Sequence, residues 1–223
     1  MMKYGVIFDC DGTLVDSLGN AYESFNYALD KIGEGPRTPE EIKRFFGTSA
    51  ERILIQLLQD EKKGVKAFSI YLEHQEEIAG QTKLHAGIRD LLDLLKEKQI
   101  PMGLVTGRHA KDLEIVLRPH QLADYFVTLI TDDQLTKSKP APEGILIASK
   151  QMGLSPTNTF YVGDSTFDLK AAHAAGSVPI AAFWDMFVDA HEMKLENPRY
   201  IAQSPNEVWN YFIQQFPNYT SGA

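Results

Sequence analysis

The sequence predicts an α/β protein in which helices cover both faces of a parallel β-sheet. Short apolar runs rich in β-branched and aromatic residues alternate with stretches of helical spacing. Strands that alternate with helices pair in parallel through crossover connections. Five strands are expected, at residues 4–8, 101–106, 125–131, 159–163 and 178–183. The helices between them are expected at residues 87–98, 110–122, 142–153 and 166–176.

Residues 18 to about 82 interrupt this alternation, because they favour helix and contain no convincing strand. Thr38, Pro39 and Glu41 have the spacing of a helix start, with an N-cap, a proline in the first turn and a capping-box acid. Residues 204–212 repeat this start signal and predict one last helix on the core. We therefore expect an α/β core of residues 1–15 and 83–223, with a helical lid inserted at residues 16–82.

The composition limits the class of partner. The net charge of −8 argues against a surface for nucleic acid or acidic membranes. Six His and one Cys provide neither a zinc-ligand pattern nor a disulfide framework. No apolar run approaches the roughly 20 residues of a membrane span, and no signal peptide is apparent. We expect a cytoplasmic protein without nucleic-acid or membrane partners, and leave open whether it is a monomer or a homodimer.

Carboxylates follow four of the five predicted strands at their carboxyl ends, where parallel sheets bind ligands. Asp132 and Asp133 follow the third strand and Asp185 the fifth. Asp9 and Asp11 follow the first apolar run, while Asp164 follows the fourth, with Asp168 four residues further on. Clustered carboxylates raise one another's pKa unless a cation offsets their charge. Because oxygen-only ligands favour a hard cation, we predict a Mg²⁺ site that also accepts the oxygens of a substrate phosphate.

Three further residues complete a predicted phosphate pocket. Thr106 offers a hydroxyl, Gly107 leaves a backbone N–H accessible, and Lys139 adds a positive charge just before a helix that begins with proline. A metal, a lysine, a hydroxyl and amides around a carboxylate nucleophile are suited to a doubly charged phosphate.

Four segments carry these residues, and they resemble a known group of enzymes. The segments "DCDGTLVDS", "VTGR", "SKPAPEG" and "GDSTFD" are similar in order and approximate spacing to the four motifs of the haloacid dehalogenase-like hydrolase superfamily. The resemblance spans nearly the whole chain and implies a Rossmann-like core with an inserted all-α C1 cap, as in phosphoglycolate phosphatases and β-phosphoglucomutases. Dehalogenases of the superfamily lack the second acid of the first motif, so Asp11 indicates phosphoryl transfer.

The resemblance also implies roles for the core residues. Asp9 would attack phosphorus and form an aspartyl-phosphate, while Asp11 would act as the general acid and base. Mg²⁺ would be held by Asp9, the Asp11 carbonyl and Asp164, with Asp168 orienting either a metal-bound water or the lysine. The phosphoryl oxygens would be held by Thr106, Gly107 and Lys139, since the motif register favours Lys139 over Lys137.

In the lid, the stretch "FFGTSAER" forms a glycine break between helices, where the cap of this family commonly touches substrate. Arg44 and Arg52 flank this break and are therefore candidate substrate-binding residues, although both could also lie on solvated faces. We predict that they bind the leaving group of the substrate.

Several other residues have simpler interpretations. Cys10 is expected to be a small core residue, and Ser165 either an N-cap or a phosphate ligand. Arg108 is expected to be a solvated residue at a helix start, with a position facing the cleft as the alternative. Trp184 and Asp185 could line the rim of the cleft. Surface or packing roles are expected for His109, His120, His173 and His191.

The predicted function is hydrolysis of a small phosphorylated metabolite, such as a phosphoglycolate-like phosphomonoester, by a Mg²⁺-dependent phosphatase. One alternative is a β-phosphoglucomutase-like isomerase. That branch carries a His after the first motif and a basic residue just before the cap glycine, where this chain has Ala21 and Phe46. A second alternative is an inactive binding protein of the same fold.

Overall fold

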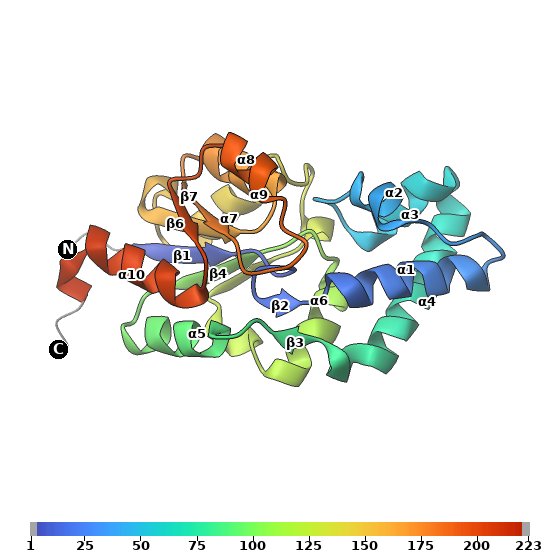
Figure 1. The fold of residues 1–223 in the computed structure, drawn as a ribbon, viewed down its shortest axis with the longest axis horizontal. Helices are drawn as coiled ribbons and strands as arrows, with labels where there is room; N and C mark the ends of the chain where they lie inside the picture. The colour runs from blue at the N-terminus through green and yellow to red at the C-terminus, as the bar shows by residue number, and fades with distance from the viewer. Residues whose placement is uncertain (1–3, 220–223) are drawn as a thin grey trace.

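A six-stranded parallel sheet forms the centre of the molecule, in the order β5-β4-β1-β6-β7-β8 (Figure 1). This computed structural model describes residues 4–219. The strands of the sheet are β1 (Gly5–Phe8), β4 (Met102–Val105), β5 (Thr128–Ile130), β6 (Thr159–Gly163), β7 (Val178–Ala182) and β8 (Tyr200–Ala202).

Ten α-helices surround the sheet or form the inserted segment within the described residues. Those that belong to the core are α5 (Ile88–Glu97), α6 (Ala110–Leu117), α7 (Glu143–Gln151), α8 (Thr166–Ala175), α9 (Ala190–Leu195) and α10 (Pro205–Gln215). Those of the insert are α1 (Leu18–Lys31), α2 (Pro39–Lys43), α3 (Ala50–Leu58) and α4 (Glu61–Ile78). No helix in residues 4–219 combines the length and apolar character needed to cross a membrane.

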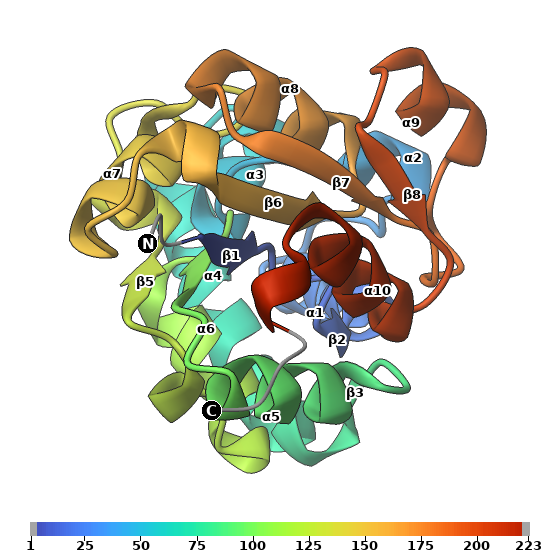
Figure 2. The same cartoon turned by 90° about the vertical axis from the view of Figure 1, so that its left-hand side faces the viewer.

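The two faces of the sheet are covered by different helices. Side chains alternate along a strand, so Val6 and Phe8 pack against α5, α6 and α10, whereas Ile7 packs against α7 and α8. Figure 2 shows α5 and α10 side by side over the first of these faces. Cys10 has no exposed surface and belongs to the same apolar cluster, as the sequence predicts. The predicted α/β fold with helices on both faces is therefore confirmed.

Helices α1–α4 pack around an apolar cluster of their own, which includes Phe25, Leu29, Ile42 and Leu54. They lie beyond the carboxyl end of the sheet (Figure 1). Both connections to the core run through a short antiparallel ribbon of β2 (Val15–Asp16) and β3 (Lys83–Leu84). The ribbon lies where the sequence analysis places the ends of the insert, although its strands were not predicted.

Local sequence signals account for several element boundaries. The capping box predicted at the start of α2 is present, with Thr38 accepting from the Glu41 N–H. Two short elements, β8 and α9, were not predicted, because runs of three and six residues are too short for periodicity to identify. The strand expected at residues 125–131 begins only at Thr128, after a turn of 3₁₀ helix.

Candidate active site

The carboxyl ends of the strands meet the insert at a cavity of about 260 Å³. Asp9 follows β1 and Asp164 follows β6, and both line this cavity. Because β1 and β6 are neighbours in the sheet, the two acids lie together although 155 positions separate them in the sequence. The predicted ligand edge of the sheet is therefore where the cavity lies.

Three acids form a cluster with the ligand atoms that a hard cation prefers. One carboxylate oxygen each from Asp9, Asp164 and Asp168 lies within 4.8 Å of the others. Burial, followed by the charges of Asp168 and Asp9, raises the pKa of Asp164 well above its ordinary value. Burial and the neighbouring carboxylates likewise raise the pKa of Asp9 to about 7, although Lys139 opposes this. An all-oxygen set with this excess of negative charge fits Mg²⁺.

The free oxygens of the cluster indicate which acids could bind the metal directly. Thr13 donates to Asp164 Oδ1 at 3.2 Å and Lys139 donates to Asp9 Oδ1 at 2.7 Å, so Oδ2 of each acid is available. Asp168 differs, because Oδ1 accepts from Lys139 and Oδ2 from the backbone N–H and hydroxyl of Ser165. Asp168 therefore suits the role of orienting Lys139 better than that of a direct ligand.

Gly12 allows the turn after Asp11 to approach Asp164. Its φ is +70°, and a Cβ at this position would lie 2.2 Å from Asp164 Oδ2. Any larger residue would therefore meet both backbone strain and a collision with the acid cluster. This explains the glycine that directly follows the two acids in the sequence.

Lys139 lies at the centre of the polar end of the cavity. Its Nζ is 2.7 Å from both Asp9 Oδ1 and Asp168 Oδ1, and its side chain is buried. The two carboxylates raise the pKa of Lys139 well above its ordinary value despite the opposing effect of burial, so the ammonium remains charged. Lys137 is exposed on the surface, which agrees with the choice of Lys139. Tyr161, which was not predicted, supports the group with a hydroxyl 3.1 Å from Asp168 Oδ1.

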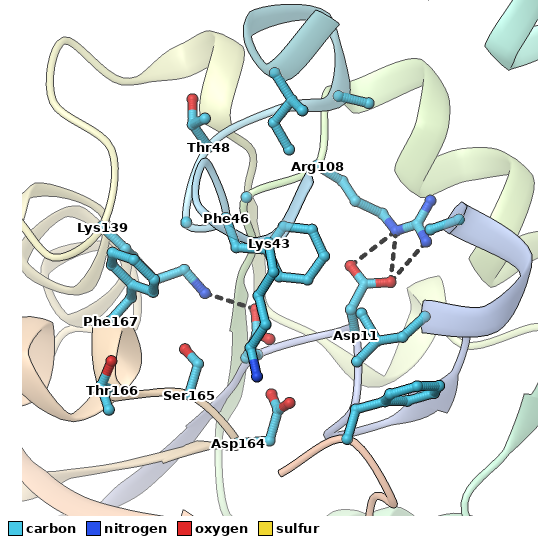
Figure 3. A pocket seen from close by; sticks show the side chains of 18 of the residues that line it. Asp11, Lys43, Phe46, Thr48, Arg108, Lys139, Asp164, Ser165, Thr166 and Phe167 are labelled. Atoms are coloured by element: carbon cyan, nitrogen blue, oxygen red, sulfur yellow. Dashed lines mark hydrogen bonds and ion pairs between the residues drawn. The ribbon is translucent and has the colours of Figure 1, made fainter. Parts of the chain in front are cut away.

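Asp11 is bound by Arg108, which is buried in the cavity lining. This corrects the prediction of a solvated arginine and agrees with the alternative that it faces the cleft. Arg108 is 5% exposed, and its Nε and Nη2 donate to the Asp11 carboxylate at 2.6–3.0 Å. Arg108 Nη1 also lies 2.6 Å from Asp112 Oδ1. Although burial raises the pKa of Asp11, Arg108 and the hydroxyl of Ser17 lower it below its ordinary value overall. The side chain of Asp11 thus points toward Arg108, away from the three-acid cluster (Figure 3).

The turn between α2 and α3 is docked on the core beside Thr106 and Gly107, which are predicted to bind phosphate. A Cβ on Gly107 would lie 3.3 Å from the Thr48 carbonyl oxygen, so a side chain there would crowd the turn. The Thr48 hydroxyl and the Ser49 N–H both donate to Asp132 Oδ2, at 3.2 and 3.1 Å. Asp132, which follows β5, thereby joins the insert to the core. Thr106 is fully buried at the end of β4, and its hydroxyl accepts the N–H of Arg108.

Neither arginine predicted to bind substrate lines the cavity. Arg52 instead donates to the Ser138 hydroxyl at 2.9 Å and lies 3.4 Å from Asp132 Oδ2, so it belongs to the docked turn. Arg44 is exposed at the end of α2. The residue one position earlier, Lys43, lines the cavity and extends into it on the side of Asp164 (Figure 3). Of the basic residues near this turn, Lys43 lines the cavity and Arg44 and Arg52 do not, so substrate binding by the two arginines stays a prediction.

The remaining predicted residues have structural partners. Ser165 caps α8, as one of its two interpretations proposed. Trp184 donates to the Thr13 carbonyl, and Asp185 lies 3.3 Å from His85, which was not predicted. The four histidines expected to have surface or packing roles do so: His109 caps α6 near Asp133, His120 and His173 contact the carbonyls of Thr82 and Glu196, and His191 is exposed.

Comparison with protein families gives a match over most of the chain. The family described as haloacid dehalogenase-like hydrolase matches residues 6–182. A phosphoglycolate phosphatase of Chromobacterium violaceum is 29% identical over 79% of this chain and 83% of its own length. A phosphoglycolate phosphatase of Escherichia coli is also 29% identical, over 92% of this chain and 90% of its own length.

Solved structures share the fold. A hydrolase from Pseudomonas syringae superposes with a TM-score of 0.83 at 21% identity, covering 95% of this chain and 99% of its own. A haloacid dehalogenase-superfamily hydrolase from Geobacter sulfurreducens has a TM-score of 0.74 at 26% identity, covering 95% of this chain and 100% of its own. The likeness extends over the insert as well as the sheet.

Proposed function

Because this chain belongs to the haloacid dehalogenase-like hydrolase family, we propose that it is a Mg²⁺-dependent phosphatase that forms an aspartyl-phosphate on Asp9. The phosphoglycolate phosphatases among its relatives support a phosphoric monoester hydrolase acting on small phosphorylated molecules. The observation that carries the proposal is the position of Lys139, 2.7 Å from both Asp9 and Asp168 beside Asp164. This group combines a nucleophile, a fixed cation and an oxygen-rich metal site.

In this proposal Asp9 supplies the attacking carboxylate oxygen, which forms the covalent intermediate. Lys139 balances part of the charge on the phosphoryl oxygens and holds Asp9 in place. Thr106 and Gly107 provide a hydroxyl and a backbone N–H to the phosphoryl oxygens. They follow β4, the strand that flanks β1 on the side away from Asp164. Asp168 keeps Lys139 in position through its own hydrogen bond.

The residues that would hold Mg²⁺ are Asp9, Asp164 and the carbonyl of Asp11. A bound Mg²⁺ would neutralise charge on the transferring phosphoryl group and allow two carboxylates to approach it. The available Oδ2 atoms of Asp9 and Asp164 support this assignment. Asp168 would contribute to the metal site only indirectly, by holding Lys139 in position.

Asp11 is proposed to transfer the proton to the leaving oxygen and later to accept one from the attacking water. In the present conformation its carboxylate is bound to Arg108 and to Ser17, at the start of the insert. We therefore propose that the side chain of Asp11 rotates toward Asp9 during the catalytic cycle. Because Ser17 belongs to the insert, we also propose that residues 16–82 act as a cap over the site.

Two measurements test the proposal. Release of inorganic phosphate should be measured for phosphoglycolate and a set of other phosphomonoesters, with Mg²⁺ and with EDTA. Acid quenching during turnover, followed by peptide mass spectrometry, should locate a phosphoryl group on Asp9. Turnover without any phosphorylated peptide at short quench times would contradict the covalent route, and absence of turnover on every ester would contradict the phosphatase.

A further inference from the structure

The two ends of the active-site cavity differ sharply in chemistry. The core end carries the polar residues Asp9, Asp164, Ser165 and Lys139, with the ring of Phe167 beside Lys139. The end within the insert is formed by side chains of α1 and α3, and these are apolar: Leu18, Ala21, Phe25, Ala50 and Ile53. A phosphoryl group bound at the core end would therefore direct its ester substituent into apolar surroundings.

Three aromatic rings also line the cavity. Tyr22 of α1 stacks on Phe46, with ring centroids 5.8 Å apart and planes 19° apart. Tyr22 also meets Phe187 edge-on, with centroids 6.0 Å apart. Phe187 belongs to the loop after β7, so the three rings join the insert to the core. Such a group offers flat apolar surface to a ligand that passes it.

The charged side chains of the cavity are not placed to receive a carboxylate at the apolar end. Lys139 is paired with Asp9 and Asp168, and Arg108 with Asp11 and Asp112. The remaining lysine of the lining, Lys43, extends toward Asp164 at the core end (Figure 3). The lining also includes the acids Asp189 and Glu192, which would repel a second anion.

Two hydroxyls of the lining that a sugar could use are already engaged. The Thr48 hydroxyl is bound to Asp132 and near Ser138, and the Tyr71 hydroxyl is bound to Arg108. Burial of a hydroxyl or carboxylate without a partner is costly, whereas burial of apolar surface is favourable. The cavity of about 260 Å³ greatly exceeds the roughly 10–15 Å³ needed for one water.

We propose that the ester substituent of the preferred substrate is uncharged and apolar, the size of a phenyl ring or a short alkyl chain. This inference rests on the phosphatase function proposed above and specifies its substrate class. It assigns the phosphate to the core end and the leaving group to the end formed by α1 and α3. Glycolate, which carries a carboxylate, and sugars, which carry several hydroxyls, fit this end poorly.

The test compares esters whose intrinsic reactivity is alike. Phosphoglycolate, glycerol 1-phosphate, n-pentyl phosphate and 2-phenylethyl phosphate are all phosphates of primary alcohols. We expect kcat/KM for 2-phenylethyl phosphate to exceed that for phosphoglycolate by about tenfold or more, since a pocket contact of one or a few methylenes changes specificity by roughly that factor. Equal values, or a preference for phosphoglycolate, would overturn the inference while leaving the phosphatase intact.

Two variants test whether the apolar end of the cavity causes the preference for an apolar ester. Ala21→Leu fills the apolar end and should reduce the ratio of kcat/KM for 2-phenylethyl phosphate to that for phosphoglycolate by about tenfold. Phe46→Ala removes one ring and should reduce the same ratio severalfold; it decides the question if Ala21→Leu does not fold. Ala174→Leu, the same change on the exposed side of α8, should leave the ratio unchanged.

The possible failures are distinguishable. An unchanged ratio in both folded variants would mean that the preference arises elsewhere, and the inference would be wrong. If no ester is hydrolysed by the wild-type protein, with Mg²⁺ present, the proposed function itself fails. Circular dichroism of each variant establishes that it is folded before its rates are interpreted.

Discussion

Arg108 and Asp11 form a buried ion pair, with Nη2 of the arginine 2.6 Å from Oδ1 of the aspartate. The two residues are 97 positions apart and follow neighbouring strands, β4 and β1. Arg108 also lies 2.6 Å from Asp112, which is four residues further on and lies in the first turn of α6. Burial raises the pKa of Asp112 to about 6 although Arg108 opposes this, so the arginine balances two acids in one covered site.

Removal of this arginine should destabilise the fold. Arg108→Met keeps the length of the side chain but leaves Asp11 and Asp112 without their cation, and the loss of one partner of a buried pair costs about 3–5 kcal/mol. We expect the free energy of unfolding in urea at neutral pH to fall by about 3 kcal/mol. Arg44→Met, the same change at an exposed position, should cost less than about 0.5 kcal/mol. Similar losses in both variants would contradict the role assigned to the buried pair.

Asp9→Asn should abolish turnover while leaving the fold intact. The amide has the shape of the carboxylate but lacks the nucleophilic oxygen, so we expect kcat to fall by at least about 10³-fold, on the order of 4 kcal/mol of barrier. Asp124→Asn makes the same chemical change at an exposed site and should keep full activity. Steady-state phosphate release checks both variants. Substantial activity in Asp9→Asn, with deamidation excluded by mass spectrometry, would refute covalent catalysis by Asp9.

The metal dependence should follow Asp164. Activity is expected to vanish with EDTA and to return with Mg²⁺, while Ca²⁺ should substitute poorly because it favours more ligands at longer distances. Asp164→Ala should raise the Mg²⁺ concentration needed for half-maximal activity more than Lys139→Ala does. A titration of each variant with Mg²⁺ makes the comparison. An unchanged Mg²⁺ requirement in Asp164→Ala would show that the metal is assigned to the wrong acid.

The stability of the metal-free protein should depend on pH through Asp9. Burial raises the pKa of Asp9 from 3.8 to about 7 in the folded state, while in the unfolded chain it stays near 3.8. Between these values the folded state binds more protons than the unfolded state, so this contribution to stability falls as the pH rises. Mg²⁺ competes with protons for the same carboxylates, and we expect it to raise Tm more at about pH 8 than at about pH 5. In Asp9→Asn, Tm measured in EDTA should depend less on pH.

Arg52 and Asp132 should affect the docking of the insert rather than the choice of substrate. Asp132 accepts two hydrogen bonds from the turn at Thr48 and Ser49, and Arg52 lies 3.4 Å from it. We expect Asp132→Asn and Arg52→Ala to lower kcat/KM severalfold, by the same factor for phosphoglycolate and for 2-phenylethyl phosphate. Arg44→Ala should leave kcat/KM unchanged for both substrates. A larger loss for phosphoglycolate alone in Arg52→Ala would restore the prediction that this arginine binds the leaving group.

The sequence predicts most of the fold because strand and helix periodicity are local properties. Five of the six strands in the described sheet, and the capping box at Thr38, are found where the sequence places them. The element β8 is different, since Tyr200–Ala202 becomes a strand only by pairing with β7. Periodicity in a three-residue segment carries no signal of this kind.

Some residues of the candidate site can also be predicted from local sequence, and others cannot. Asp9 and Asp164 can be identified because each follows a strand, and Asp168 and Lys139 because they lie in the first turn of α8 and shortly before α7, within the motifs. The environment of Arg108 depends on Asp11, 97 positions away, although its i,i+4 partner Asp112 is a signal visible in the sequence. The choice of Lys43 over Arg44 depends on the direction in which each side chain leaves a short helix. Residue type and spacing do not determine that direction.

Cys10 has a practical consequence for the study of this protein. The chain has one cysteine, its side chain is completely buried, and burial raises the pKa of its thiol well above the ordinary value. A thiol-specific reagent should therefore react only when the fold opens, and no other thiol competes for it. The labelling rate in native buffer then measures that opening without denaturant or an attached dye. Any ion or ester that binds the folded state should slow the labelling in proportion to its occupancy, so the protein contains its own binding assay.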